Sequence, residues 1–157
     1  MSAGLSDALK VRITGLSGRY PRKQAALLPV LHAVQEELGC VTVEAERDVA
    51  ALLGIKPIQV REAVTFYSMF RRTPVGRYHL QVCDNLSCGL RGSGTVLARL
   101  CRKLGIAPGQ TTLDGKFTLT TVECLGNCEN APCLMVNFDY HGNIDPDALD
   151  RILDGLA

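Results

Sequence analysis

The chain has 157 residues, of which 46% are hydrophobic and 21% charged, and its formal net charge at pH 7 is +1. This composition is typical of one globular domain or two small units, and the near-neutral charge argues against nucleic acid or acidic lipid as a partner. The longest apolar run, residues 25–34, falls well short of the roughly 20 residues of a membrane span. We therefore predict no direct membrane insertion. Because residues 1–10 lack an export signal, we also expect a cytoplasmic location.

Residues 1–75 are predicted to form a small helical bundle. Apolar residues recur with helical spacing over residues 24–38, and a second helical pattern covers residues 43–53. A third helix is expected to open at Pro57, because proline suits the first turn of a helix. The first 20 residues are expected to be loosely helical at best.

Residues 76–157 change to a mixed pattern after a boundary near residue 75. Alternating residues predict a first strand, and Asp145 followed by Pro146 marks the start of the last helix. The predicted elements are a strand at 77–82, a helix at 94–104, strands at 117–122 and 133–138, and the final helix. The order β-α-β-β-α predicts an α/β sandwich that resembles a thioredoxin-type core, so the whole chain is expected to be α+β with an α/β second domain.

Cysteine is the most informative residue type. The chain has seven: Cys40, Cys83, Cys88, Cys101, Cys124, Cys128 and Cys133. An odd number without an export signal argues against a disulfide framework and favours thiolates kept for a metal or for catalysis.

Four of these cysteines form two pairs, each expected where a strand runs into a loop. Cys83 and Cys88 have the spacing C-x4-C, and Cys124 and Cys128 have the spacing C-x3-C. If the two strands are neighbours, their loops can bring four sulfur atoms together. The longer C-x4-C loop favours a [2Fe-2S] cluster, whereas structural zinc prefers C-x2-C, but spacing alone leaves zinc open.

The loops around these pairs suit a negatively charged cluster. Glycines such as Gly92 and Gly126 would let backbone N–H groups approach sulfur closely. Arg91 either adds positive charge beside the cluster or is an ordinary surface arginine.

Several stretches together resemble one known family. They are FYSMF at 66–70, PVGRYH at 74–79, VCDNLSCGLRG at 82–92, VECLGNC at 122–128, and Ala131-Pro132. Residues 18–157 are similar to the thioredoxin-like [2Fe-2S] subunit, or E subunit, of bacterial NADH-quinone oxidoreductase, which is respiratory complex I.

The helical bundle (1–75) is expected to dock on a partner, because residues 57–70 carry more apolar surface than the core of the bundle can cover. The resemblance implies a thioredoxin-like [2Fe-2S] ferredoxin domain over residues 76–157. It implies cluster ligands at Cys83, Cys88, Cys124 and Cys128, with no catalytic residue in this chain. FMN and NADH are expected only on the flavin-binding, NADH-oxidising F subunit, in the peripheral arm of a membrane-associated complex. Related subunits serve NAD-dependent formate dehydrogenases and NAD-reducing hydrogenases, which leaves those parent complexes as alternatives.

The other prominent residues have structural interpretations. Cys40, Cys101 and Cys133 are expected to be buried apolar residues, since free cysteine is often buried. The aromatic cluster at 66–70 is expected in the core, with an exposed patch for a partner subunit as the alternative. Two function classes remain, an electron-transfer subunit and a zinc-stapled interaction module without a redox role.

Overall fold

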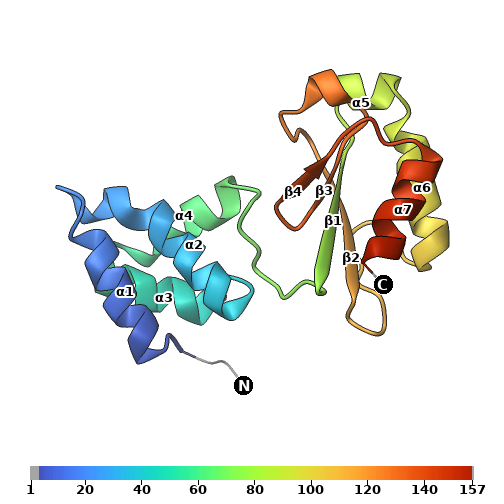
Figure 1. Cartoon of the computed structure of the whole chain (residues 1–157). Coiled ribbons are helices and arrows are strands. Elements are labelled where there is room, and N and C mark those ends of the chain that lie inside the picture. Colours follow the sequence, from blue (N-terminus) through green and yellow to red (C-terminus); the bar gives the residue numbers. More distant parts are fainter. Residues whose placement is uncertain (1–3, 157) are drawn as a thin grey trace. The chain divides into compact units, whose positions relative to one another are not determined.

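The computed structural model describes residues 4–156, and the chain divides into two compact units, Met1–Pro74 and Val75–Ala157 (Figure 1). The first unit is helical and the second combines a sheet with helices. Across residues 4–156, no helix combines the length and hydrophobicity needed to cross a bilayer.

Within residues 4–74, the first unit contains four α-helices and a short 3-10 helix. They are α1 (Asp7–Ser17), η1 (Lys23–Ala26), α2 (Leu27–Leu38), α3 (Val43–Leu53) and α4 (Pro57–Phe66). The helices predicted at 43–53 and from Pro57 are confirmed. The single helix predicted over 24–38 is instead a 3-10 turn followed by α2.

The N-terminal segment is a regular helix, so the expectation of loose helicity there is wrong. Ser6 caps α1, and its Oγ accepts a hydrogen bond of 3.1 Å from the N–H of Leu9. Leu9 and Ile13 lie four residues apart on the buried face of this helix. Capping and burial together stabilise a segment whose helical pattern is short.

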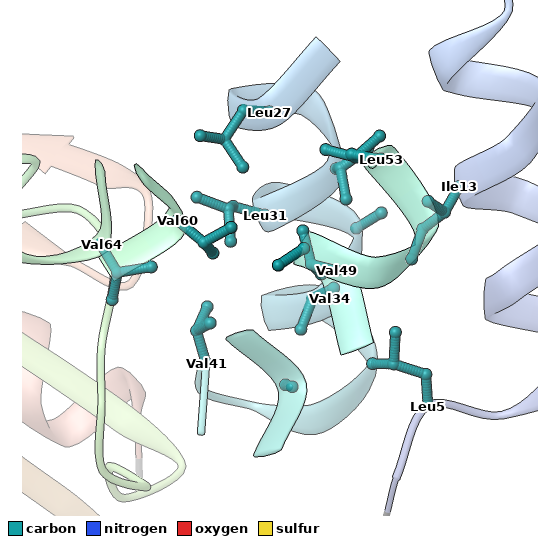
Figure 2. Close-up of a cluster of buried hydrophobic side chains, with 14 of the residues drawn as sticks. Leu5, Ile13, Leu27, Leu31, Val34, Val41, Val49, Leu53, Val60 and Val64 are labelled. Atoms are coloured by element: carbon teal, nitrogen blue, oxygen red, sulfur yellow. The ribbon is translucent and has the colours of Figure 1, made fainter. Parts of the chain in front are cut away.

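One hydrophobic core holds the first unit together. Figure 2 shows Leu31 and Val34 of α2 beside Val49 of α3 and Val60 of α4, and all four side chains are buried. The segment after α4 is attached to this bundle through the buried amide of Gln35. Its Nε2 donates to the carbonyl of Met69 (2.9 Å), and its Oε1 accepts from the N–H of Arg71 (2.6 Å).

The second unit is built on a four-stranded mixed sheet. Its elements are β1 (Tyr78–Cys83), α5 (Leu86–Leu90), α6 (Ser93–Leu104), β2 (Phe117–Val122), η2 (Cys128–Asn130), β3 (Leu134–Val136), β4 (Asp139–His141) and α7 (Pro146–Gly155). The strand order is β2-β1-β3-β4, with β1 parallel to β2 and antiparallel to β3. Helices α6 and α7 pack on one face of this sheet (Figure 1).

The strand predicted over 133–138 is shorter than expected. Asn137 has φ = 55°, and the chain turns there into β4, which pairs antiparallel with β3. Asparagine tolerates this left-handed conformation better than most residues, so β3 and β4 form a hairpin. Asp145 caps α7 and Pro146 begins it, as the sequence predicts.

Candidate metal centre

The two cysteine pairs lie at the C-terminal ends of two neighbouring strands, β1 and β2. Parallel strands β1 and β2 are in register from Tyr78↔Phe117 to Cys83↔Val122. Cys83 is the last residue of β1, and Cys124 follows the last residue of β2 by two positions. The expectation that the two loops leave neighbouring strands at one end is therefore confirmed.

The second loop contacts the first at Cys83. The Cys83 thiol points to the carbonyl of Glu123, with Sγ 4.0 Å from the oxygen. The backbone N–H of Leu125 also forms a hydrogen bond with the Cys83 sulfur. Cys124 lies between these two residues in the sequence, so its loop is already in place against the first cysteine pair.

Cys88 lies on α5, a five-residue helix that the sequence pattern did not predict. Asn85 caps this helix, with its side-chain oxygen 2.7 Å from the N–H of Leu86. Because α5 turns back immediately after β1, it buries Cys88 next to Cys83.

The structure groups Cys83 and Cys88 with a third cysteine, Cys133. The three sulfur atoms all lie within 4.8 Å of one another, and the Cys88 and Cys133 sulfurs are 3.4 Å apart. The three residues are only 3%, 1% and 2% exposed, respectively. Cys124 and Cys128 are exposed and belong to no such group within the part of the chain that the structure describes.

The electrostatics of the three buried thiols differ. Burial acts to raise the pKa of Cys83, but this pKa is lowered overall by hydrogen bonds from the N–H groups of Asn85 and Leu125 together with those from the Cys88 and Cys133 thiols. Burial raises the pKa of Cys88. Burial and the neighbouring sulfurs raise the pKa of Cys133 to about 12. Cys83 is therefore the thiol of the three that most readily becomes a thiolate.

Gly126 acts as the sequence suggests, whereas the N–H of Gly92 donates to the carbonyl of Gly89 (3.1 Å) and not to a sulfur. Gly126 has φ = 73°, and its N–H donates to the Cys124 sulfur at 3.3 Å. Gly92 has φ = 95° and occupies the N-cap of α6. Arg91, which is exposed, donates from Nε to the carbonyl of Ala131 (3.4 Å) and so connects the end of α5 to the segment before Cys133.

The expectations for the remaining cysteines and aromatics had mixed outcomes. Cys40 and Cys133 are buried as expected, whereas Cys101 is only partly buried against the core of the second unit. Phe70 is buried, but Phe66 is 79% exposed, so the core assignment is wrong for Phe66. It lies at the end of α4, where the buried face of the helix runs through Val60 and Val64.

The place of Cys133 beside Cys88 is the feature that sequence reasoning missed. The only signal was the extended run C-x3-C-x4-C ending at Cys133. Its position depends on the antiparallel pairing of β1 with β3, which brings together residues about 50 positions apart.

The cysteine sulfurs at the ends of β1 and β2 are suitable ligands for an iron–sulfur cluster. Thiolates are the ligands that hold such clusters, and hydrogen bonds to the sulfurs help to set their potential. Cys83 and Cys124 both receive backbone N–H donors. The residues present therefore suit a [2Fe-2S] group, which supplies one-electron transfer when bound.

Comparison with known proteins gives the family. Residues 13–157 match the thioredoxin-like [2Fe-2S] ferredoxin family. The chain is 46% identical to the second E subunit of the NADH-quinone oxidoreductase of Rhizobium meliloti, over 94% of this chain and 88% of that protein. It is 39% identical to the E subunit of the NADH-quinone oxidoreductase of Pseudomonas aeruginosa, over 98% of this chain and 92% of that protein.

A solved structure agrees at the level of the fold. The NAD+-reducing [NiFe]-hydrogenase in its air-oxidized state matches with a TM-score of 0.71 and 23% identity, over 83% of this chain and 22% of that chain. The matches to the family and to these relatives extend over nearly all of the sequence. The chain belongs to the thioredoxin-like [2Fe-2S] ferredoxin family and, within it, to the E subunits of NADH-quinone oxidoreductase.

Proposed function

We propose that this chain is an electron-transfer subunit that holds one [2Fe-2S] cluster on Cys83, Cys88, Cys124 and Cys128. It works beside the flavin-binding, NADH-oxidising F subunit of NADH-quinone oxidoreductase. One observation carries the proposal. The two cysteine-bearing loops leave the same end of two parallel strands, and the second loop contacts the first at Cys83.

Cys133 is left out of this ligand set for a structural reason. Its backbone carbonyl accepts a hydrogen bond of 3.2 Å from the N–H of Cys83, and it enters strand β3 directly. Cys124 and Cys128, in contrast, are exposed and lie outside the strands, Cys124 in a loop and Cys128 at the start of the short helix η2. An exposed loop can adjust to a cluster more easily than a residue fixed between two strands.

The chain's own residues bind the cluster and limit its contact with water. The buried pair Cys83 and Cys88 forms the inner side of the site. The N–H groups of Asn85, Leu125 and Gly126 point to cysteine sulfurs, and they favour the negative charge that a reduced cluster carries. The second pair, Cys124 and Cys128, is exposed and forms the outer side of the site.

We assign NADH and FMN to the partner subunit. The Gly-Ser-Gly sequence at 92–94 lacks the third glycine of a dinucleotide-binding loop, because residue 97 is leucine. Gly92 instead caps α6. We assign this chain to the peripheral arm of the membrane-associated complex.

Residues 1–75, which are the first unit and one residue beyond it, serve as the docking arm for the partner. Ile58, Phe66 and Met69 are 57%, 79% and 47% exposed, and they lie on or just after α4. Phe66 and Tyr67 also line a shallow hollow with Leu28 of α2. Exposed aromatic and methionine side chains are enriched at protein interfaces, which supports this role.

The proposal is tested by reduction with NADH in the presence and absence of the F subunit. The purified chain alone should not be reduced by NADH, because it has no nucleotide site of its own. Adding the flavin-loaded F subunit should produce the electron paramagnetic resonance signal of the reduced cluster. Reduction of the isolated chain, or no reduction with the partner present, would contradict the proposed role.

A further inference from the structure

A second metal-binding arrangement overlaps the proposed cluster site. Cys83, Cys88 and Cys133 have their sulfur atoms within 4.8 Å of one another, and the closest pair is 3.4 Å apart. Sulfur atoms around one ion with metal–sulfur bonds near 2.3 Å are separated by about 4 Å. The three sulfurs are therefore already close to the spacing that a single ion requires.

Two backbone contacts that hold the segments carrying these three sulfurs do not involve the side chains of Cys124 or Cys128. Cys83 and Cys133 lie at adjoining ends of β1 and β3, joined by the hydrogen bond from the Cys83 N–H to the Cys133 carbonyl (3.2 Å). Cys88 is fixed by α5, in which the Gly89 N–H donates to the Asn85 carbonyl (2.7 Å). Backbone hydrogen bonds therefore hold the segments that carry these three sulfurs.

The number and chemical type of the metal ligands, three cysteine sulfurs, determine which ion the site would bind. Thiolates favour soft cations such as Cu(I), and zinc is almost always four-coordinate in structural sites. The group supplies three sulfurs, each at most 3% exposed, and no other histidine, cysteine or carboxylate among residues 4–156 joins it. Three buried donors with little access for water suit a three-coordinate soft cation. Hydrogen bonds from the N–H groups of Asn85 and Leu125 to the Cys83 sulfur offset part of the negative charge.

We propose that in the cluster-free chain Cys83, Cys88 and Cys133 form a three-sulfur binding site for Cu(I). Binding releases thiol protons to solvent and changes no oxidation state. The copper site itself stands on the three-sulfur geometry alone. Its consequence rests on the proposed function: because Cys83 and Cys88 are shared, bound Cu(I) and the [2Fe-2S] cluster exclude each other.

The site is tested by titrating the full-length, cluster-free chain with Cu(I) under anaerobic conditions against a coloured Cu(I) chelator. The wild-type chain should bind one Cu(I), and Cys133→Ala should weaken this binding by about 100-fold or more, since one of three ligands is lost. The Cys124→Ala/Cys128→Ala double variant should bind Cu(I) as tightly as wild type. Cys40→Ala, which removes a buried cysteine in the first unit, is the matched control and should change nothing.

Wild-type affinity in Cys133→Ala, or loss of copper binding in the Cys124→Ala/Cys128→Ala variant, would overturn the site. Folding of Cys133→Ala is checked by its ability to take up the cluster, because it keeps all four proposed ligands. X-ray absorption on the copper-loaded wild-type chain gives a result that needs no variant. Three sulfur neighbours support the site, and two or four overturn it.

Competition with the cluster is measured by reconstitution. Wild-type chain preloaded with Cu(I) should fail to regain the visible spectrum of the cluster, whereas Cys133→Ala treated in the same way should regain it. Equal reconstitution of both proteins would contradict the exclusion. If neither protein forms a cluster without copper, the proposed function fails, and the copper titration still decides the three-sulfur site.

Discussion

The backbone N–H of Cys83 donates a 3.2 Å hydrogen bond to the carbonyl of Cys133, which joins the end of β1 to the start of β3. This contact brings a third buried sulfur next to Cys83 and Cys88, while Cys124 and Cys128 are exposed. Which cysteines hold the cluster is therefore a question that variants of single residues can answer.

We expect Cys133→Ala to keep the visible and paramagnetic spectra of the cluster, and Cys128→Ala to degrade them. Loss of the buried Cys133 sulfur should lower the free energy of unfolding by about 1 kcal/mol through the small cavity it leaves. An altered spectrum in Cys133→Ala alone would show that the ligand assignment is wrong. The double variant tests whether Cys133 replaces Cys128: a spectrum present in Cys128→Ala and absent from Cys128→Ala/Cys133→Ala would reveal such replacement.

Gln35→Ala should destabilise the first unit. Its buried amide satisfies both the Met69 carbonyl and the Arg71 N–H, so the variant leaves polar backbone groups without their partner. We expect the free energy of unfolding to fall by about 2 kcal/mol, measured by urea denaturation. Gln24→Ala, at an exposed position, is the control and should have little effect. Equal stability of both variants would show that the amide does not hold the 69–71 segment.

Phe66→Ala should weaken binding to the F subunit without unfolding the chain. Phe66 is 79% exposed, so its removal should change the free energy of unfolding by less than about 0.5 kcal/mol. Val11→Ala, at an exposed apolar position on α1, is the matched control. Affinity measured by calorimetry should fall for Phe66→Ala and stay the same for Val11→Ala. Unchanged affinity in Phe66→Ala would argue against docking through the end of α4.

Removing the cluster should destabilise the second unit and leave the first unchanged. All four proposed ligands belong to Val75–Ala157, and metal binding energy contributes directly to the stability of the unit that binds it. Hydrogen exchange should therefore become faster in β1 and β2 of the cluster-free chain, with α2 and α3 unaffected. A uniform increase over both units would indicate that they unfold together.

The fold could be predicted where the sequence carries local signals. Asp145 and Pro146 define the start of α7, and the alternation at 117–122 coincides with β2. Helix α5 could not be predicted, because five residues are too few to show a helical period. The β3–β4 hairpin depends on the positive φ of Asn137, a conformation that the apolar run gave no reason to expect.

The sequence predicted where the two cysteine pairs lie, at the ends of two strands. It did not predict which side chains contact one another there. Two cysteine pairs after two strands indicated where metal ligands would lie, because parallel neighbours end at the same edge. The approach of Cys133 to Cys88 follows from pairing between strands far apart in the sequence. Phe66 lies two positions after Val64 and so points away from the face of α4 that Val60 and Val64 bury, which helical spacing could have shown.

The most direct test of the central claim is the metal content of the purified chain together with its paramagnetic resonance spectrum after one-electron reduction. One [2Fe-2S] cluster predicts about two iron atoms and two acid-labile sulfides per chain, a reddish-brown colour and a signal that appears on reduction. A colourless protein with stoichiometric zinc, no iron and no signal would contradict it and would favour a zinc-stapled interaction module.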